Sequence, residues 1–369
     1  MKDLRVALVG LGTAGHTLHL PALAGLAGAT VVGAYDADEA KRARAARDWR
    51  VPVHATGDGL FAAAPDVVVV GTPPDSHAEY CRRAIEAGAH VICEKPFASS
   101  VEEADSILAD AASAGVGVAV NHDFTEMPIF RAVRDEVRSP QNGRLVFVQV
   151  WQLMDLPPWR EPGWRGRLLQ RTLYEAGTHL VDFVMTLFGE KPVSVQAATS
   201  SCGVREDRTD ALALVTLEFS GGRLAQIVQN RLCKGETQYF EVRADTEQAS
   251  IRASFGGRAR LLAGLFRSSR PRARVEWGAS GLAWREIGNH RRVIGRNPKS
   301  PGVVATRRVF ESAFDAFRRG VEPPASGRQG RDVLEVIAAC YHAVAVGRRV
   351  PIDSREVRDL ATQRLGQAP

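Results

Sequence analysis

An apolar run at residues 5–9 passes directly into a glycine-spaced segment, Gly10-Leu11-Gly12-Thr13-Ala14-Gly15, and then into a helical stretch. A buried strand, a Gly-x-Gly-x-x-Gly turn and a helix in this order begin a doubly wound parallel sheet that binds a dinucleotide. Gly10 permits the tight turn, Gly12 lets backbone amides approach a pyrophosphate, and Gly15 lets the helix pack on the strand. The free N–H groups at the helix start then favour the phosphates. We therefore expect five residues of this turn to hold the cofactor: Gly10, Gly12, Thr13, Ala14 and Gly15.

A second apolar strand, at residues 30–35, ends at Asp36. An acidic residue about twenty positions after the glycines can accept hydrogen bonds from the ribose hydroxyls of a dinucleotide. Asp36 and nearby Asp38 would also repel a 2′-phosphate, so the sequence favours NAD over NADP, although Lys41 and Arg42 soften that preference. The alternative role for Asp36 is to cap a helix that begins near residue 38.

Strands and helices continue to alternate up to about residue 122, which predicts a parallel sheet of about six strands. The apolar strand at 66–70 runs into Thr72 and Pro73, and His77 follows. Because prolines cannot continue a strand, the chain turns here at the carboxyl edge of the sheet, over the cofactor. We expect Thr72 and Pro73 to lie at the cofactor, whereas His77 either contacts it or caps the next helix.

The strand at 90–93 closes on Glu94-Lys95-Pro96. Open α/β sheets bind their ligands at the carboxyl ends of the strands, so a lysine at this position points at bound cofactor. Lys95 is therefore a candidate to donate or accept a proton beside a nicotinamide. The Lys95–Pro96 peptide bond is a candidate for the cis form, which proline makes accessible in turns.

After residue 122 the pattern changes to consecutive strands with short turns, which predicts a large, mostly antiparallel open sheet. The fold class is thus α/β, with a dinucleotide-binding domain at 1–122 and a substrate-binding and oligomerisation α/β domain at 123–369. An open sheet needs cover, which self-association would provide. Segment 258–296 reads as strands with long loops or as a partly mobile flap. Two amphipathic helices ending at Gly320 and Gly347 can pack back on the first domain. The strands are expected at 144–152, 194–200, 210–219, 223–231 and 239–253.

One helix, predicted at 174–188, carries three titratable side chains beside its apolar stripe. At 100° per residue, Glu175, His179 and Asp182 fall within about 60° of arc. A carboxylate at this spacing can orient a histidine that exchanges protons near neutral pH. The alternative is an exposed polar flank with Glu175 near the helix start, where acids are favoured.

Composition excludes several other classes of protein. The net charge is +6, but the basic residues are spread along the chain without interleaved aromatics, so nucleic-acid binding is not expected. The five cysteines are scattered and show no metal-binding spacing, so we expect reduced thiols and no metal. The first strand leaves no room for a leader, and no apolar run approaches the ~20 residues of a membrane span. The expected location is the cytoplasm.

Taken together, these motifs resemble the Gfo/Idh/MocA family, the relatives of glucose–fructose oxidoreductase and inositol dehydrogenase. The resemblance covers almost the whole chain and implies a Rossmann domain followed by an open-sheet domain that often forms homodimers or homotetramers. It implies that Lys95 hydrogen-bonds the reacting oxygen, that His179 is the acid/base histidine, and that Arg165 lies near the cofactor. It rests on five segments: 10–22, 71–77, Glu94-Lys95-Pro96, 177–182 and 324–347.

The chain also departs from the family pattern. Glu175 stands where the family usually has Asp, Gln170-Arg171-Thr172 replaces a glycine-rich run, and an expected Arg near residues 122–124 is absent. These differences suggest an unusual substrate.

The implied reaction is NAD(P)-dependent hydride transfer at a secondary alcohol or ketone of a sugar, amino sugar or cyclitol. Lys95 and His179 would move the proton, Glu175 would orient His179, and His122 and Asp182 would bind substrate hydroxyls. Two alternatives remain. Transient oxidation by bound NAD would support epimerisation, elimination or glycoside cleavage without net redox change, and a regulator would bind the nucleotide without catalysis. The expected cofactor contacts are Gly10, Gly12, Thr13, Ala14, Gly15, Asp36, Thr72, Pro73, His77, Glu94, Lys95 and Arg165.

Overall fold

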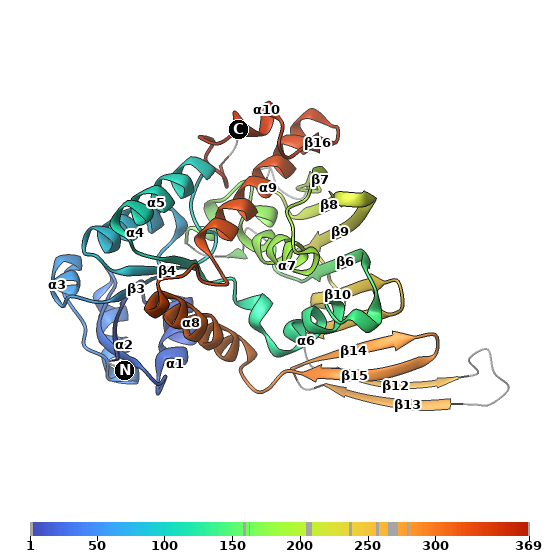
Figure 1. Cartoon of the computed structure of the whole chain (residues 1–369), viewed down its shortest axis with the longest axis horizontal. Coiled ribbons are helices and arrows are strands. Elements are labelled where there is room, and N and C mark those ends of the chain that lie inside the picture. The colour runs from blue at the N-terminus through green and yellow to red at the C-terminus, as the bar shows by residue number, and fades with distance from the viewer. Residues whose placement is uncertain are drawn as a thin grey trace.

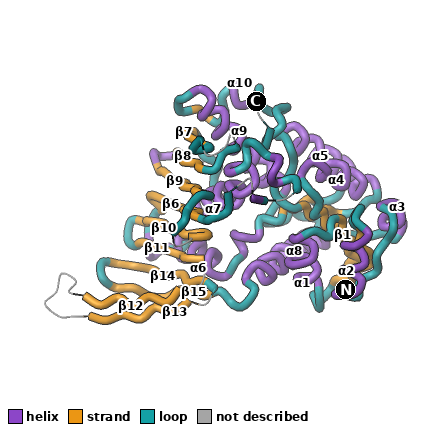
Figure 2. Tube along the Cα trace, turned by 180° about the vertical axis from the view of Figure 1, so that it is seen from behind, coloured by secondary structure: helices purple, strands orange, loops and turns teal. Residues whose placement is uncertain are grey.

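The described part of the protein has two large sheets with helices between and around them, and a separate two-stranded sheet (Figure 1). The computed structural model describes residues 3–157, 160–161, 163–203, 209–235, 238–255, 258–264, 272–278 and 280–367. Figure 2 shows from behind that α6, α7 and α9 lie between the large sheet and the first domain. The α/β class predicted from the sequence is confirmed.

The first sheet has five parallel strands in the order β2-β1-β3-β4-β5, one fewer than the sequence suggested. Beyond β5 the chain does not make another crossover. Instead the edge of β5 meets a segment from near the end of the chain, where the amide of Val120 donates to the carbonyl of Ala325 at 2.9 Å. The strands are β1 (Leu4–Val9), β2 (Ala29–Tyr35), β3 (Val67–Val70), β4 (His90–Cys93) and β5 (Val118–Val120).

Helices cover both faces of this sheet, which explains why β3 is apolar throughout. Val68 and Val70 pack with α4 and α5, whereas Val67 and Val69 pack with α1 and with phenylalanines of α8. Helix α8 therefore returns to the first domain from far along the chain. The helices are η1 (Gly15–His19), α1 (Leu20–Leu23), α2 (Glu39–Trp49), α3 (Gly57–Ala62), η2 (Pro74–Ser76), α4 (His77–Glu86), α5 (Val101–Ala114) and α8 (Pro301–Arg319).

The second sheet has nine strands in the order β15-β14-β11-β10-β6-β9-β8-β7-β16. All neighbours are antiparallel except β6 and β9. The single strand expected at 239–253 is a hairpin of two strands, because the chain turns at residues 247–249. The strands are β6 (Leu145–Leu153), β7 (Ser194–Ser200), β8 (Leu212–Phe219), β9 (Arg223–Asn230), β10 (Gln238–Thr246), β11 (Ser250–Phe255), β14 (Gly281–Ile287), β15 (His290–Arg296) and β16 (Val350–Pro351).

The segment at 258–296 forms four strands. β12 (Arg258–Gly264) and β13 (Arg272–Gly278) pair only with each other and lie beside β14 and β15 at one end of the molecule (Figure 1). The expectation of long loops is wrong between β14 and β15, which a two-residue turn joins. Residues 265–271 lie outside the described part of the chain.

Helices cover one face of the nine-stranded sheet: α6 (Pro128–Val137) lies on β11, β14 and β15, α7 (Thr178–Phe188) on β6 and β9, and α9 (Gly327–Val346) on β7. Helices α8 and α9 end at Gly320 and Gly347, both with positive φ, as the sequence predicted. On the opposite face, Leu214 of β8 and Leu224 of β9 remain exposed. None of the described helices is both long and apolar enough to cross a bilayer.

Candidate active site

The glycine turn after β1 has the geometry that a dinucleotide phosphate requires. Gly10 has φ +94°, and a Cβ there would lie 2.4 Å from the carbonyl carbon of Gly71. A Cβ on Gly15 would lie 2.3 Å from the carbonyl oxygen of Gly10, so neither position tolerates a side chain. A Cβ on Gly12 would meet nothing within 4 Å. The turn thus leaves open space beside Gly12, as the sequence prediction of a phosphate-binding turn requires. Thr13 is exposed beside that space, and Ala14 is the N-cap of η1.

Asp36 joins the end of β2 to this turn. Its carboxylate accepts hydrogen bonds from the amides of Leu11 at 2.8 Å and Asp38 at 2.9 Å. The N-cap of α2 is Asp38, whose carboxylate accepts from the amide of Ala40. The alternative in which Asp36 caps the helix is therefore wrong, and its position at the rim of the phosphate turn remains compatible with ribose binding.

Thr72 and Pro73 follow β3 at the same carboxyl edge, and His77 begins α4 behind them. The His77 ring is fully buried, with Nε2 2.8 Å from the carbonyl oxygen of Thr72 and Nδ1 3.0 Å from that of Pro96. Burial lowers the pKa of His77. The ring therefore connects two loops at the edge of the sheet, and its nitrogens face the backbone rather than the open turn.

The Lys95–Pro96 bond is cis, as hypothesised from the sequence. The preceding residue, Glu94, accepts hydrogen bonds from His19 Nε2 at 2.7 Å and Asn121 Nδ2 at 2.6 Å. Burial alone would raise the pKa of Glu94, but these hydrogen bonds and the charge of Lys95 lower it to about 2. Glu94 is thus an ionised carboxylate that fixes the ends of neighbouring strands.

Lys95 reaches across to the second domain. Its Nζ donates to the carbonyl oxygen of Glu175 at 2.9 Å and lies 3.6 Å from Glu175 Oε1, and the side chain is 12% exposed. The ammonium group therefore lies at the start of the helix that carries His179.

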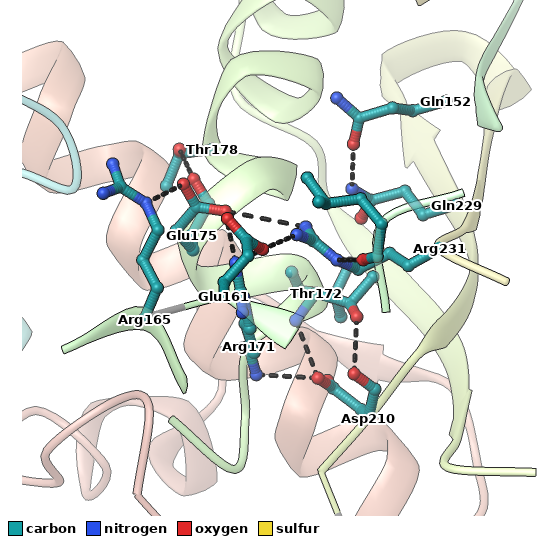
Figure 3. A network of polar contacts seen from close by, with 12 residues as sticks. Gln152, Glu161, Arg165, Arg171, Thr172, Glu175, Thr178, Asp210, Gln229 and Arg231 are labelled. Atoms are coloured by element: carbon teal, nitrogen blue, oxygen red, sulfur yellow. Dashed lines mark hydrogen bonds and ion pairs between the residues drawn. The ribbon is translucent and has the colours of Figure 1, made fainter. Parts of the chain in front are cut away.

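This helix begins differently from the expected regular α-helix. Residues Thr172–Gly177 form a π-turn, η7, before α7. Because a π-turn is wider than an α-turn, the angles derived at 100° per residue do not apply to Glu175. Its carboxylate points at guanidinium groups (Figure 3): Oε1 lies 3.0 Å from Arg165 Nε, and Oε2 lies 3.6 Å from Arg231 Nη1. The expectation that Glu175 orients His179 is corrected accordingly.

The environment of Glu175 is strongly cationic. Burial would raise its pKa, but Lys95, Arg231, Arg165 and Arg171 together hold the pKa well below its ordinary value. Arg165, near the cofactor by family resemblance, also stacks on Trp164 with 4.5 Å between its guanidinium carbon and the ring centre. Glu175 is thus permanently ionised and ties Arg165 to Lys95.

Asp210 anchors the start of η7, a role that the sequence did not reveal. Its Oδ1 accepts from the backbone amides of Arg171 and Thr172, both at 2.7 Å, and its Oδ2 accepts from Tyr341 at 2.8 Å (Figure 3 shows the amide contacts). These partners are 38, 39 and 131 residues away from Asp210. No local pattern could have indicated them.

His179 lies at the other end of the same turn, 8% exposed and packed against the ring of Phe124 at 4.2 Å. Its pKa lies well below the ordinary value because of burial and the nearby charges of Lys95 and His122. Its Nδ1 lies 3.8 Å from Oδ1 of Asp123. Burial and the charge of Glu94, opposed by Lys95, raise the pKa of Asp123 to about 7.

The sequence patterns also did not identify Asp123 as a residue of the site. The available signal was its position three residues after the end of β5, at the carboxyl edge where ligands bind.

The structure divides the four expected substrate-binding residues into two groups. Lys95 and His179 lie at η7. His122 and Asp182 instead line a polar cavity of about 410 Å³, and neither Lys95 nor His179 belongs to its lining. Asp182 accepts from Gln329 at 2.5 Å, and burial raises its pKa. Among the described side chains, no cluster of three or more histidines, cysteines and acids could hold a metal ion.

Comparisons with known proteins match most of the chain to one family. Residues 4–122 match the model of the oxidoreductase family with an NAD-binding Rossmann fold, and residues 130–252 match the GFO/IDH/MocA C-terminal domain. The fold and the glycine turn thus define an NAD(P)-dependent oxidoreductase. The chain belongs to the Gfo/Idh/MocA family.

The relatives are distant in sequence. The chain is 26% identical to the 1,5-anhydro-D-fructose reductase of Ensifer adhaerens over 78% of its own length and 80% of the relative's. It is 24% identical to the D-apiose dehydrogenase of Paraburkholderia graminis, over 96% and 92% of the two chains. A solved oxidoreductase from Agrobacterium radiobacter, in complex with NAD⁺, L-tartaric acid and magnesium, superposes with a TM-score of 0.79 at 18% identity, covering 95% and 99%.

Proposed function

We propose that this oxidoreductase transfers a hydride at a secondary alcohol or ketone of a sugar, amino sugar or cyclitol, with Lys95 and His179 moving the proton. The observation that carries the proposal is the 2.9 Å contact between Lys95 Nζ and the carbonyl oxygen of Glu175. It brings an ammonium from the end of β4 against the turn that precedes His179. The named activities of the two relatives, on anhydrofructose and apiose, support a polyol substrate.

Each side chain has a distinct role in this proposal. When bound, the nicotinamide accepts or supplies the hydride. The ammonium of Lys95 stabilises the negative charge that develops on the substrate oxygen, an effect often worth a few kcal/mol in a site with little water. His179 exchanges the proton of that oxygen through Nε2, since its Nδ1 is buried on the side of Asp123. Glu175 keeps Lys95 and Arg165 in place.

NAD is the preferred cofactor in this proposal, because the carboxylate of Asp36 at the rim of the turn would repel a 2′-phosphate. Lys41 Nζ lies 3.4 Å from Asp36 Oδ1 and is 45% exposed, so it offsets this repulsion only partly. The exposed leucines on the open face of the nine-stranded sheet support a homodimer or homotetramer.

The proposal is tested with a panel of sugars, amino sugars and cyclitols, assayed in both directions with NAD and with NADP. Steady accumulation of reduced cofactor with one substrate class supports net oxidation. A stoichiometric transient that does not accumulate would indicate transient oxidation instead. Turnover by the Lys95→Met variant within about tenfold of the wild type would contradict the proposed roles.

A further inference from the structure

The buried Nδ1 of His179 has no hydrogen-bond partner among the described residues, yet a carboxylate lies close to it. Asp123 Oδ1 is 3.8 Å away, about 1 Å more than a charge-assisted hydrogen bond. Hydrogen bonds of catalytic groups are often long before substrate binds and shorten in the complex. Both side chains are at least nine-tenths buried, so water competes little for the contact.

Among the described residues, the other two acids near His179 are engaged elsewhere. Glu175, four residues before His179, is engaged by Arg165, Arg231 and Lys95. Asp182, one turn further along α7, accepts from Gln329 instead. Asp123 is thus the acid that is placed to hydrogen-bond Nδ1 of His179.

We propose that Asp123 is a positioning residue that selects which ring nitrogen of His179 carries the proton. This rests on the proposed function. Ionised Asp123 accepts from Nδ1–H, which leaves Nε2 as a proton acceptor facing the substrate. Protonated Asp123 donates to Nδ1, which leaves Nε2–H as a proton donor.

The proton count balances in both directions. In alcohol oxidation, Nε2 takes the hydroxyl proton as the hydride leaves carbon, and ionised Asp123 stabilises the resulting imidazolium. In ketone reduction, Nε2–H gives its proton to the carbonyl oxygen as hydride arrives, and Nδ1 takes the proton of Asp123. The histidine ends neutral in that second case, with the charge on the carboxylate.

The surrounding groups set the pH at which this exchange occurs. Lys95, His122 and Glu175 face His179, and Lys95, Glu94 and Tyr239 face Asp123. Burial keeps Tyr239 neutral by raising its pKa to about 12, and Glu94 is ionised with a pKa of about 2. Asp123, whose pKa lies at about 7, therefore changes charge near that pH. The rate of alcohol oxidation is expected to increase as the pH rises through that value, and the rate of ketone reduction is expected to increase as the pH falls through it.

The direct test is ¹⁵N NMR of protein labelled at histidine, with the His179 signals assigned from a His179→Gln variant. Nitrogen shifts distinguish the two tautomers without any assay of turnover. We expect the wild-type His179 to change tautomer near pH 7 and Asp123→Asn to hold one tautomer throughout. A wild-type His179 that keeps one tautomer from pH 5 to 9 would overturn the inference.

Kinetics provide the second measurement. In Asp123→Asn, whose amide can donate to Nδ1, oxidation should fall roughly 10- to 100-fold at pH 8, reduction at pH 6 should change much less, and the inflection should vanish. Asp123→Glu should restore part of the inflection. The matched control is Glu335→Gln, which neutralises a buried carboxylate of α9 paired with Lys191 and Arg331.

The outcomes separate the two proposals. An unchanged pH profile in Asp123→Asn, together with an inactive Lys95→Met, would refute the role of Asp123 and leave the proposed function standing. An active Lys95→Met would refute the proposed function itself.

Discussion

The ammonium of Lys95 donates a hydrogen bond to the backbone carbonyl of Glu175 at 2.9 Å, although the two residues are 80 positions apart. The contact crosses from the end of β4 to the π-turn before α7. It uses a backbone oxygen, so the position of Lys95 depends on the path of η7 as much as on the charge of the Glu175 side chain.

Replacing Lys95 with Met should reduce kcat by at least about a hundredfold, because the cation that stabilises the charged oxygen is lost. The affinity for NAD should remain within about twofold, since the phosphate turn and Asp36 are untouched. Isothermal titration and steady-state kinetics separate these effects. Lys191→Met is the matched control, since Lys191 also pairs with acids, but these are Asp332 and Glu335 of α9 rather than Glu175 of η7. Equal losses of NAD affinity and kcat would place Lys95 in cofactor binding instead.

Loss of Asp210 should destabilise the start of η7, although Asp210 is not among the residues proposed to contact substrate. Asp210→Ala leaves the amides of Arg171 and Thr172 and the hydroxyl of Tyr341 without their acceptor. Unfolding free energy should fall by about 2–4 kcal/mol, measured by urea denaturation. Asp110→Ala, at a half-exposed acid of α5, should change stability by less than about 0.5 kcal/mol. A loss in Asp210→Ala no larger than in this control would show that η7 does not depend on the anchor.

The strands and most helix ends were predictable because their signals are local. β3 is apolar at every position since helices cover both of its faces, and α8 and α9 end at glycines in the left-handed region. The surroundings of His179 were not predictable in the same way. A π-turn has no period that distinguishes it in a single sequence, and it turned Glu175 away from the histidine. Asp123 reaches His179 only because the short helix η3 (Asp123–Glu126) packs on α7, although the two residues are 56 positions apart.

Glu94 should make the stability of the protein depend on pH in the acidic range. Its pKa is lowered from 4.5 to about 2 in the folded state, so the stabilisation is complete above about pH 5 and is lost as the pH falls toward 2. The difference corresponds to about 3 kcal/mol. In Glu94→Gln this component of the urea-denaturation pH profile between pH 6 and 3 should disappear. An identical slope in the two proteins would show that the carboxylate of Glu94 is not stabilised by His19 and Asn121.

Asp36 should decide between the two nicotinamide cofactors. Replacing it with Ser removes the negative charge beside the 2′-position and should raise the affinity for NADP relative to NAD by at least about tenfold. The substitution also removes the acceptor of the Leu11 amide, so some loss of affinity for both cofactors is expected. The ratio of the two dissociation constants, measured by quenching of intrinsic tryptophan fluorescence, is therefore the informative quantity. Asp38→Asn, which retains an N-cap for α2, serves as the control because it removes a neighbouring charge without changing the rim of the turn. If both variants shift the ratio equally, discrimination comes from the overall negative charge of this corner and not from Asp36 itself.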